Sequence, residues 1–199
     1  MDASLKIFGI PTSRALRCLW MARELGIPFE NDPVHFQKTH ESDALKAINP
    51  NVRIPAIDDN GFHLYESMAI NLYLAKKYGA GSPLVPMSLE DEARTTQWSF
   101  WVMTEIEKLA LAMMFDALKM RPLSEDARAA TQAELERPLG ALEQHLQDRD
   151  YLLGDHFTVA DLNVASVMAW ARWGKVDMSK FPKAADWLKR CMGRPAFKG

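Results

Sequence analysis

The groups that could do chemistry gather in one stretch, from Asn49 to Ser67. Pro55 opens a short apolar run, and because proline lacks an N–H it belongs at a strand's first residue or in a tight turn. X-Pro bonds adopt the cis form at a cost of only about 0.5–1 kcal/mol. A cis Ile54-Pro55 bond would turn the N–H and C=O of Ile54 outward, where an extended peptide can pair with them. Glu66 and Ser67 then start a helix, whose N-terminus attracts anions, so the stretch predicts a site for a small acidic peptide.

A small α/β module positions these residues. The patterns predict a strand over 5–8, a helix over 13–25 that stops at Gly26, and a second strand over 29–34. A strand–helix–strand order implies a parallel pair joined by a right-handed crossover. A short helix over 40–48 then leads to the Pro55 strand.

A hairpin and a helix complete the module. Residues 62–65 are predicted to pair with the Pro55 strand across a turn at 58–61. A helix over 66–78 follows, and Gly79 caps it.

The composition changes after Gly79. Residues 80–88 are rich in glycine and proline, and long helices are predicted beyond them, over 89–120 and 124–147. Pro138 is expected to kink the second of these, since it removes one backbone hydrogen bond. A final helix is predicted over 182–192. The predicted organisation is an α/β domain over 1–79, a linker over 80–88 and an all-helical domain over 89–199.

A capping box begins another helix in the second half of the chain. Thr158 and Asp161 are spaced so that each side chain can bond the other's backbone N–H, and Phe157 and Leu162 stand where a hydrophobic staple is expected. We interpret the box as structural. Loss of the Thr158 cap is expected to cost about 0.5–2 kcal/mol.

The composition excludes several classes of protein. The 199 residues are 48% hydrophobic and 25% charged with a net charge of −2, as in a soluble globular protein without a basic surface for nucleic acid. No apolar run reaches the roughly 18 residues of a membrane span, and no leader pattern precedes the first strand, so we expect a cytoplasmic protein. Cys18 and Cys191 form no C-x-x-C pair, so we expect buried thiols and no metal site.

Taken together, the motifs resemble those of the cytosolic glutathione S-transferase family, over nearly the whole chain. Those that carry the resemblance are Asn49-Pro50, Ile54-Pro55, Glu66-Ser67 and the Phe157–Asp161 box, in that order and spacing. The resemblance is to a serine-type, bacterial-like member. It implies a thioredoxin-like N-terminal domain, an all-helical C-terminal domain, a role in detoxification and a homodimer.

Glutathione is γ-Glu-Cys-Gly, and the resemblance assigns each of its polar groups a partner. Ser67 would hold the γ-glutamyl carboxylate at the helix start, and Glu66 the ammonium. Ile54, preceding Pro55, would pair with the cysteinyl backbone as in strand addition. His40 and Arg53 are the candidates for the glycyl carboxylate. Plain helix capping, a turn proline and a solvated surface are the respective alternatives to these roles.

A thiolate is needed for the reaction, and the resemblance assigns its partner to the start of the first helix. A serine-type enzyme carries Pro-x-Ser with an arginine four residues later, which Pro11, Ser13 and Arg17 match. Ser13 is the first candidate, Thr12 the second, and Arg17 could hold the hydroxyl or add positive potential. A simple N-cap is the alternative for Ser13.

The second substrate of the family lies against the long first helix of the helical domain. Trp98, Trp101 and Glu105 fall on one helical face and could line that site for an apolar electrophile, with core packing as the alternative. The sequence predicts a glutathione transferase with no metal. A glutathione-binding scaffold protein with little turnover stays open, as does a glutathione-dependent dehalogenase, peroxidase or isomerase.

Overall fold

A computed structural model describes residues 5–199 of the chain. The Cα positions divide them into two compact units, one of residues 5–85 with Gly199 and one of Pro86–Lys198.

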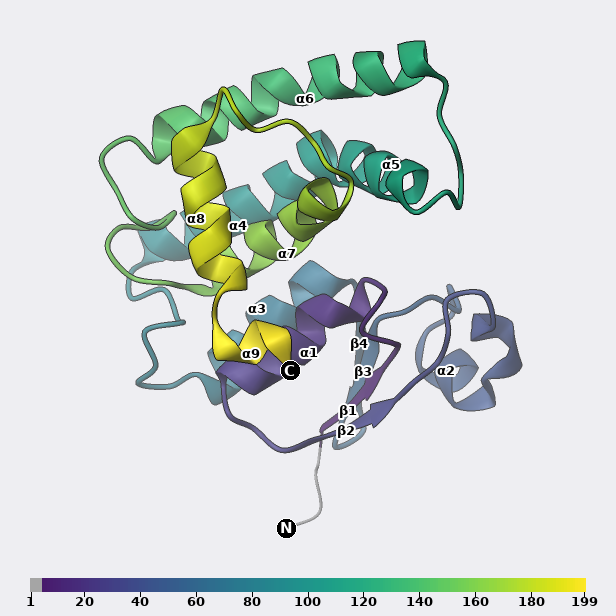
Figure 1. Ribbon diagram of the computed structural model, residues 1–199. Coiled ribbons are helices and arrows are strands. Elements are labelled where there is room, and N and C mark those ends of the chain that lie inside the picture. The colour runs from purple at the N-terminus through teal and green to yellow at the C-terminus, as the bar shows by residue number, and fades with distance from the viewer. Residues whose placement is uncertain (1–4) are drawn as a thin grey trace. The chain divides into compact units, whose positions relative to one another are not determined.

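The first unit is built on a mixed four-stranded sheet with the order β2-β1-β3-β4 (Figure 1). Its strands are β1 (Leu5–Phe8), β2 (Phe29–Asp32), β3 (Ala56–Asp59) and β4 (Phe62–Tyr65). β1 runs parallel to β2, with α1 (Ala15–Glu24) as the crossover, while β3 pairs antiparallel with both β1 and β4. The predicted crossover and hairpin are confirmed.

Helices cover both faces of this sheet. α1 packs beside α3 (Ser67–Tyr78) on one face, and η1 (Thr39–Glu41) and α2 (Asp43–Ile48) lie on the other (Figure 1). Trp20 of α1 is fully buried on the first face. On the second, Leu45 of α2 packs against Ile54 and neighbours from the sheet.

The second unit is entirely helical within the residues described. Its helices are α4 (Leu89–Trp101), η2 (Val102–Ile106), α5 (Glu107–Ala117), α6 (Glu125–His145), α7 (Val159–Trp173), α8 (Pro182–Met192) and α9 (Pro195–Lys198). α7 is the central helix: it is buried from Val159 to Ala171 and packs against α4, α5 and α8. The Thr158–Asp161 capping box begins it, as predicted.

Some predicted boundaries are wrong for local reasons. The helix expected over 89–120 ends at Ala117 and contains the π-helical turn η2, which inserts an extra residue into its register. β2 stops at Asp32 because Pro33 follows. α6 continues through the buried Pro138. None of the described helices is both long and apolar enough to span a bilayer.

Candidate functional site

The Ile54-Pro55 bond is cis, and the loop that precedes it is fixed by the buried side chain of Asn49. The Asn49 amide donates to the Arg53 carbonyl at 2.8 Å, and its oxygen accepts from the Asn51 N–H at 3.0 Å. Ile54 buries its side chain in the sheet core. Among residues 5–199, neither its N–H nor its C=O has a hydrogen-bond partner. These are the free groups that a second extended chain needs.

Gly9 connects this loop to the start of α1. A β-carbon built on Gly9 would lie 2.6 Å from the Ala15 Cβ and 3.2 Å from the Ile54 Cβ, so any side chain here would push α1 and the loop apart. Its φ of 130° also favours glycine. Our sequence reasoning missed Gly9, although a glycine between a strand and a helix is a signal for such an approach. Gly9 thus brings the Ser13 end of α1 close to Ile54.

Glu66 and Ser67 start α3 in a way that plain capping does not explain. Glu66 occupies the N-cap position but makes no side-chain cap hydrogen bond, and its carboxylate is exposed. Its φ of 72° is uncommon for a residue with a side chain. Ser67 is 3% exposed. The backbone at Glu66 therefore turns the first N–H groups of α3 outward without a cap from the chain itself.

The hydroxyl of Ser67 is held by Arg17. The Arg17 Nη1 donates to the Ser67 Oγ at 3.1 Å, and the arginine is almost fully buried. Because the Ser67 oxygen accepts this bond, its hydroxyl hydrogen is available for an acceptor outside. Arg17 thus lies one helical turn beyond Ser13, but its guanidinium holds Ser67 at the start of α3.

Ser13 lies just before α1 and is 8% exposed. Its hydroxyl donates to the Ile10 carbonyl at 2.7 Å and accepts from the Ala15 N–H at 3.1 Å. Both functions of the hydroxyl are therefore in use, and a sulfur would have to compete for the hydrogen. Thr12 is exposed, and its hydroxyl has no hydrogen-bond partner within the described part of the chain.

Cys18 lies beside the site but is not a candidate nucleophile. Its thiol is fully buried, and its Sγ lies 3.8 Å from the Ser67 carbonyl. Burial raises the pKa of the Cys18 thiol well above its usual range, although Arg17 opposes the shift. The thiol stays protonated, as expected of a small buried hydrophobe.

His40 in η1 and Arg53 in the loop before Pro55 are both exposed. Within residues 5–199 neither side chain makes a hydrogen bond or an ion pair. Each is therefore a solvated donor on the loop side of the sheet. No contact of the structure brings the two together.

Comparisons with known proteins bear on the family to which the chain belongs. Residues 3–76 match the family model described as Glutathione S-transferase, N-terminal domain, and residues 102–195 match that of the C-terminal domain. Glutathione S-transferase theta-1 of Mus musculus is 34% identical over 198 residues, which cover 94% of this chain and 82% of the mouse protein. The chain belongs to the glutathione S-transferase family.

Solved structures of glutathione transferases share the fold. Glutathione S-transferase-I bound with lactoylglutathione aligns with a TM-score of 0.86 and 26% identity, over 98% of this chain and 97% of the other. A glutathione transferase family member from Pseudomonas fluorescens with two glutathione bound gives 0.83 and 26%, over 98% and 91%. The predicted family, two-domain fold and enzyme class are confirmed, while the serine-type, bacterial-like subtype stays a prediction.

The predicted wall for the second substrate of this glutathione transferase lies in the helical unit. Trp98 is 8% exposed, and its ring lies edge-on to Trp101 and to His145 of α6, with centroids 4.8 and 4.7 Å apart. Glu105, in the π-helical turn, pairs with Arg137 of α6. All three residues thus contact neighbours of their own unit, and their role toward a substrate stays a prediction.

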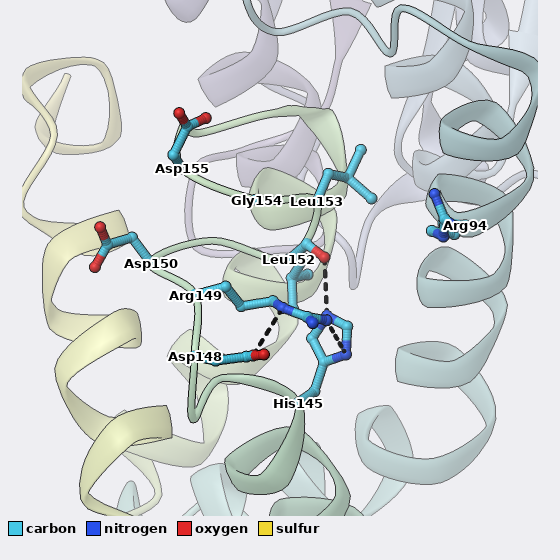
Figure 2. Close-up of a pocket in the computed structure, with 9 residues that line it drawn as sticks. All are labelled: Arg94, His145, Asp148, Arg149, Asp150, Leu152, Leu153, Gly154 and Asp155. Carbon is cyan, nitrogen blue, oxygen red and sulfur yellow. Dashed lines mark hydrogen bonds and ion pairs between the residues drawn. The ribbon is translucent and has the colours of Figure 1, made fainter.

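A polar cavity of about 610 Å³ lies next to these residues, between α4, the end of α6 and the loop that follows it (Figure 2). His145, Arg94 and Arg149 line it. Arg149 pairs with Asp148 at 3.2 Å, and Arg94 pairs with Asp91 at 2.9 Å. The cations of this cavity are therefore compensated by their own neighbours. Across residues 5–199, no group of three histidine, cysteine or acidic side chains could hold a metal ion.

Proposed function

We propose that the protein binds glutathione along the edge of its first unit and presents the thiolate to an apolar electrophile. The observation that carries the proposal is the hydroxyl of Ser67, whose oxygen is occupied by Arg17 while its hydrogen is available. A γ-glutamyl carboxylate would accept that hydrogen and the N–H groups at the start of α3. Glu66, uncapped and exposed, would bind the ammonium.

The rest of the tripeptide would extend from Ser67 toward the start of α1. The free N–H and C=O of Ile54 would pair with the cysteinyl backbone, as in strand addition. His40 and Arg53 would reach the glycyl carboxylate, for which a guanidinium is suited because it can bind both oxygens. The convergence of Ile54 and α1 on Gly9 would then put the sulfur near Ser13 and Thr12.

At that position the thiol would lose its proton to solvent and be kept as a thiolate. A hydroxyl of Ser13 or Thr12 would donate to the sulfur, and the N-terminus of α1 would add positive potential. The thiolate sulfur would then form a bond to the electrophilic carbon. Either a leaving group departs with the electron pair of the bond that breaks, or the π electrons of an activated double bond move to the neighbouring atom, which takes up a proton from solvent. Trp98, Trp101 and Glu105 remain the proposed residues on the second substrate's side.

We also propose a cytoplasmic homodimer. Phe62 and Tyr65, 48% and 36% exposed, lie on the edge strand β4, and the Phe62 ring lies tilted against that of Tyr73 of α3, with centroids 4.9 Å apart. Apolar side chains on an unpaired sheet edge favour a second copy of the chain. Sedimentation of the wild type and of Phe62→Ser tests this, and a monomeric wild type at micromolar concentration would contradict it.

The test of the function is the binding and use of glutathione by Ser67→Ala. Loss of one hydrogen bond to a charged group costs about 1.5–3 kcal/mol. The dissociation constant measured by calorimetry should therefore be roughly 10- to 150-fold larger. Ser88→Ala is the control, since Ser88 caps α4 in the second unit. Wild type that binds no glutathione, or Ser67→Ala that binds it as tightly as wild type, would refute this site. Binding without conjugation of any electrophile in a broad panel would refute the activity.

A further inference from the structure

The C-terminal ends of α5 and α7 lie next to each other in the helical unit (Figure 1). Gly174 directly follows α7, and a β-carbon built on it would lie 2.7 Å from the backbone of Met113 and Met114 in α5. Arg128 of α6 links the two ends, because it pairs with Asp116 of α5 and donates to the Gly174 carbonyl at 3.3 Å. The residues that end the two helices therefore share one end of the unit.

Three large apolar side chains are exposed at this end. Leu118 and Met120 follow α5 and are 57% and 48% exposed, and Trp173, the last residue of α7, is 40% exposed. Trp170, one turn earlier in α7, is 3% exposed. The core of the unit thus encloses α7 up to its last turn and leaves the indole of Trp173 at the surface. Exposed apolar side chains that gather in this way mark a site of interaction.

Three cations lie among these apolar side chains. Lys119, Arg172 and Lys175 are exposed, and none of them makes an ion pair with any of residues 5–199. Asp177, the acid that follows Lys175, accepts a hydrogen bond from the Ser179 N–H at 2.9 Å. The cations are therefore not compensated within the described chain. We call the six residues the helix-end patch: Leu118, Lys119, Met120, Arg172, Trp173 and Lys175.

Helix capping explains only part of the helix-end patch. Cations are stabilising at the C-terminal end of a helix, where its dipole is negative, and this accounts for the positions of the three charges. It does not account for an exposed indole and two long apolar side chains beside them. Tryptophan next to lysine and arginine is the composition found where a protein meets the headgroups of a membrane.

We propose that the helix-end patch binds the surface of an anionic lipid bilayer. Trp173, Leu118 and Met120 would enter the boundary between headgroups and acyl chains, and the three cations would lie among the anionic headgroups. Charge complementarity argues for an anionic surface. The contact would be peripheral, since none of the described helices can span a bilayer. This inference goes beyond the proposed function, because it requires no glutathione.

Co-sedimentation with lipid vesicles tests the proposal on the full chain without glutathione. The vesicles contain either phosphatidylcholine alone or an equimolar mixture of phosphatidylcholine and phosphatidylserine. We expect the wild type to bind the mixture and not phosphatidylcholine alone, and added salt to weaken that binding. Lys119→Asn and Lys175→Asn should each lower the partition coefficient about threefold to fivefold. Asparagine suits both positions, whose φ angles are 58° and 55°, because it tolerates left-handed backbone.

The aromatic contribution has its own test. Trp173→Ser should lower the partition coefficient about fivefold, because the indole no longer enters the interface. Brominated phosphatidylcholine in the mixture quenches tryptophans that reach the acyl chains. We expect quenching in the wild type and much less in Trp173→Phe, which keeps an apolar ring and should still bind.

Lys183→Gln is the control, since it removes one exposed positive charge at the start of α8. The neighbouring Ala184 bonds to Glu143 near the end of α6, whereas the helix-end patch adjoins Arg128 near its start. The partition coefficient of Lys183→Gln should therefore equal that of the wild type. Unchanged thermal unfolding of each variant shows that it is folded, as expected for replacements of exposed side chains.

Several results would overturn the proposal. They are failure of the wild type to bind the mixture, equal binding to the two kinds of vesicle, a loss in Lys183→Gln equal to those in the patch variants, and bound protein without quenching. Binding to polyglutamate but not to the vesicles would assign the patch to an acidic protein instead. Because glutathione is absent from every measurement, a negative result leaves the proposed function standing.

Discussion

The replacement Ser13→Ala should raise the thiol pKa of bound glutathione by about one unit. A hydroxyl that donates to a thiolate contributes about 1.5–3 kcal/mol. In this structure the same hydrogen is already donated to the Ile10 carbonyl at 2.7 Å, a neutral bond worth about 0.5–1.5 kcal/mol. The net preference for the anion is therefore roughly 1.3 kcal/mol, which corresponds to about one pKa unit.

The N-terminus of α1 adds about 0.3–1 kcal/mol, and the variant keeps it. From an ordinary thiol pKa of about 8.5, we expect a value near 7 for the wild type and near 8 for Ser13→Ala. At pH 7 the fraction of thiolate, and kcat/KM with it, should then fall about fivefold. The acidic limb of the pH profile should move to higher pH, since more base is needed to ionise the thiol.

Ultraviolet titration of the bound thiolate measures the pKa directly, and conjugation of dinitrochlorobenzene measures the profile. Ser13→Thr keeps a hydroxyl and should retain the low pKa, whereas Thr12→Val tests the competing residue. Ser13→Ala also removes the acceptor for the Ala15 N–H, so about 0.5–2 kcal/mol of stability should be lost. An unchanged pKa in Ser13→Ala with a raised pKa in Thr12→Val would transfer the role to Thr12. No change in either variant would refute hydroxyl stabilisation altogether.

Three further replacements test the framework. Arg17→Met should weaken glutathione binding and cost about 1.5–3 kcal/mol of stability, because the Ser67 hydroxyl loses its buried donor; unchanged affinity in calorimetry would contradict this. Burial opposes ionisation of Asp59, but bonds from Lys77 and two tyrosines outweigh it and lower its pKa. The stabilisation by the Asp59 carboxylate is present above its pKa in the unfolded chain, about 3.9, and is lost as pH falls below that value. Asp59→Asn should therefore be less stable at pH 7 by about 1.5–3 kcal/mol. In urea titrations this variant should lack the acid-dependent loss of stability. Thr158→Ala should lower the free energy of unfolding by about 0.5–2 kcal/mol while Thr158→Ser does not, and equal losses in the two would exclude a capping role.

Features set by neighbouring residues were predictable from the sequence. The β3–β4 hairpin, the helix start at Ser67 and the Thr158–Asp161 box each depend on residue types within a few positions. The same local rules predicted α8 at its observed bounds. Such rules are reliable because turns and caps form from the chain's own nearest groups.

Features that depend on distant or backbone partners were not predictable. Arg17 and Ser67 are fifty positions apart, so nothing local indicates that one holds the hydroxyl of the other. The Ser13 hydroxyl donates to a backbone carbonyl, and because every residue has such a carbonyl, the residue types do not indicate this bond. The π-helical turn after Trp101 adds one residue to a helix, and apolar spacing does not resolve a shift of that size.

The two serines at the ends of the site differ in what their hydroxyls can still do. Ser67 uses its oxygen as the acceptor for Arg17, and its hydrogen has no acceptor among residues 5–199. Ser13 uses both its hydrogen and its oxygen within the chain. In the proposed binding mode, the carboxylate end would therefore be preorganised, whereas the sulfur end would have to exchange one hydrogen bond for another. It follows that affinity for the tripeptide should come mainly from α3 and Ile54, and that stabilisation of the thiolate is the smaller difference between two similar bonds at α1.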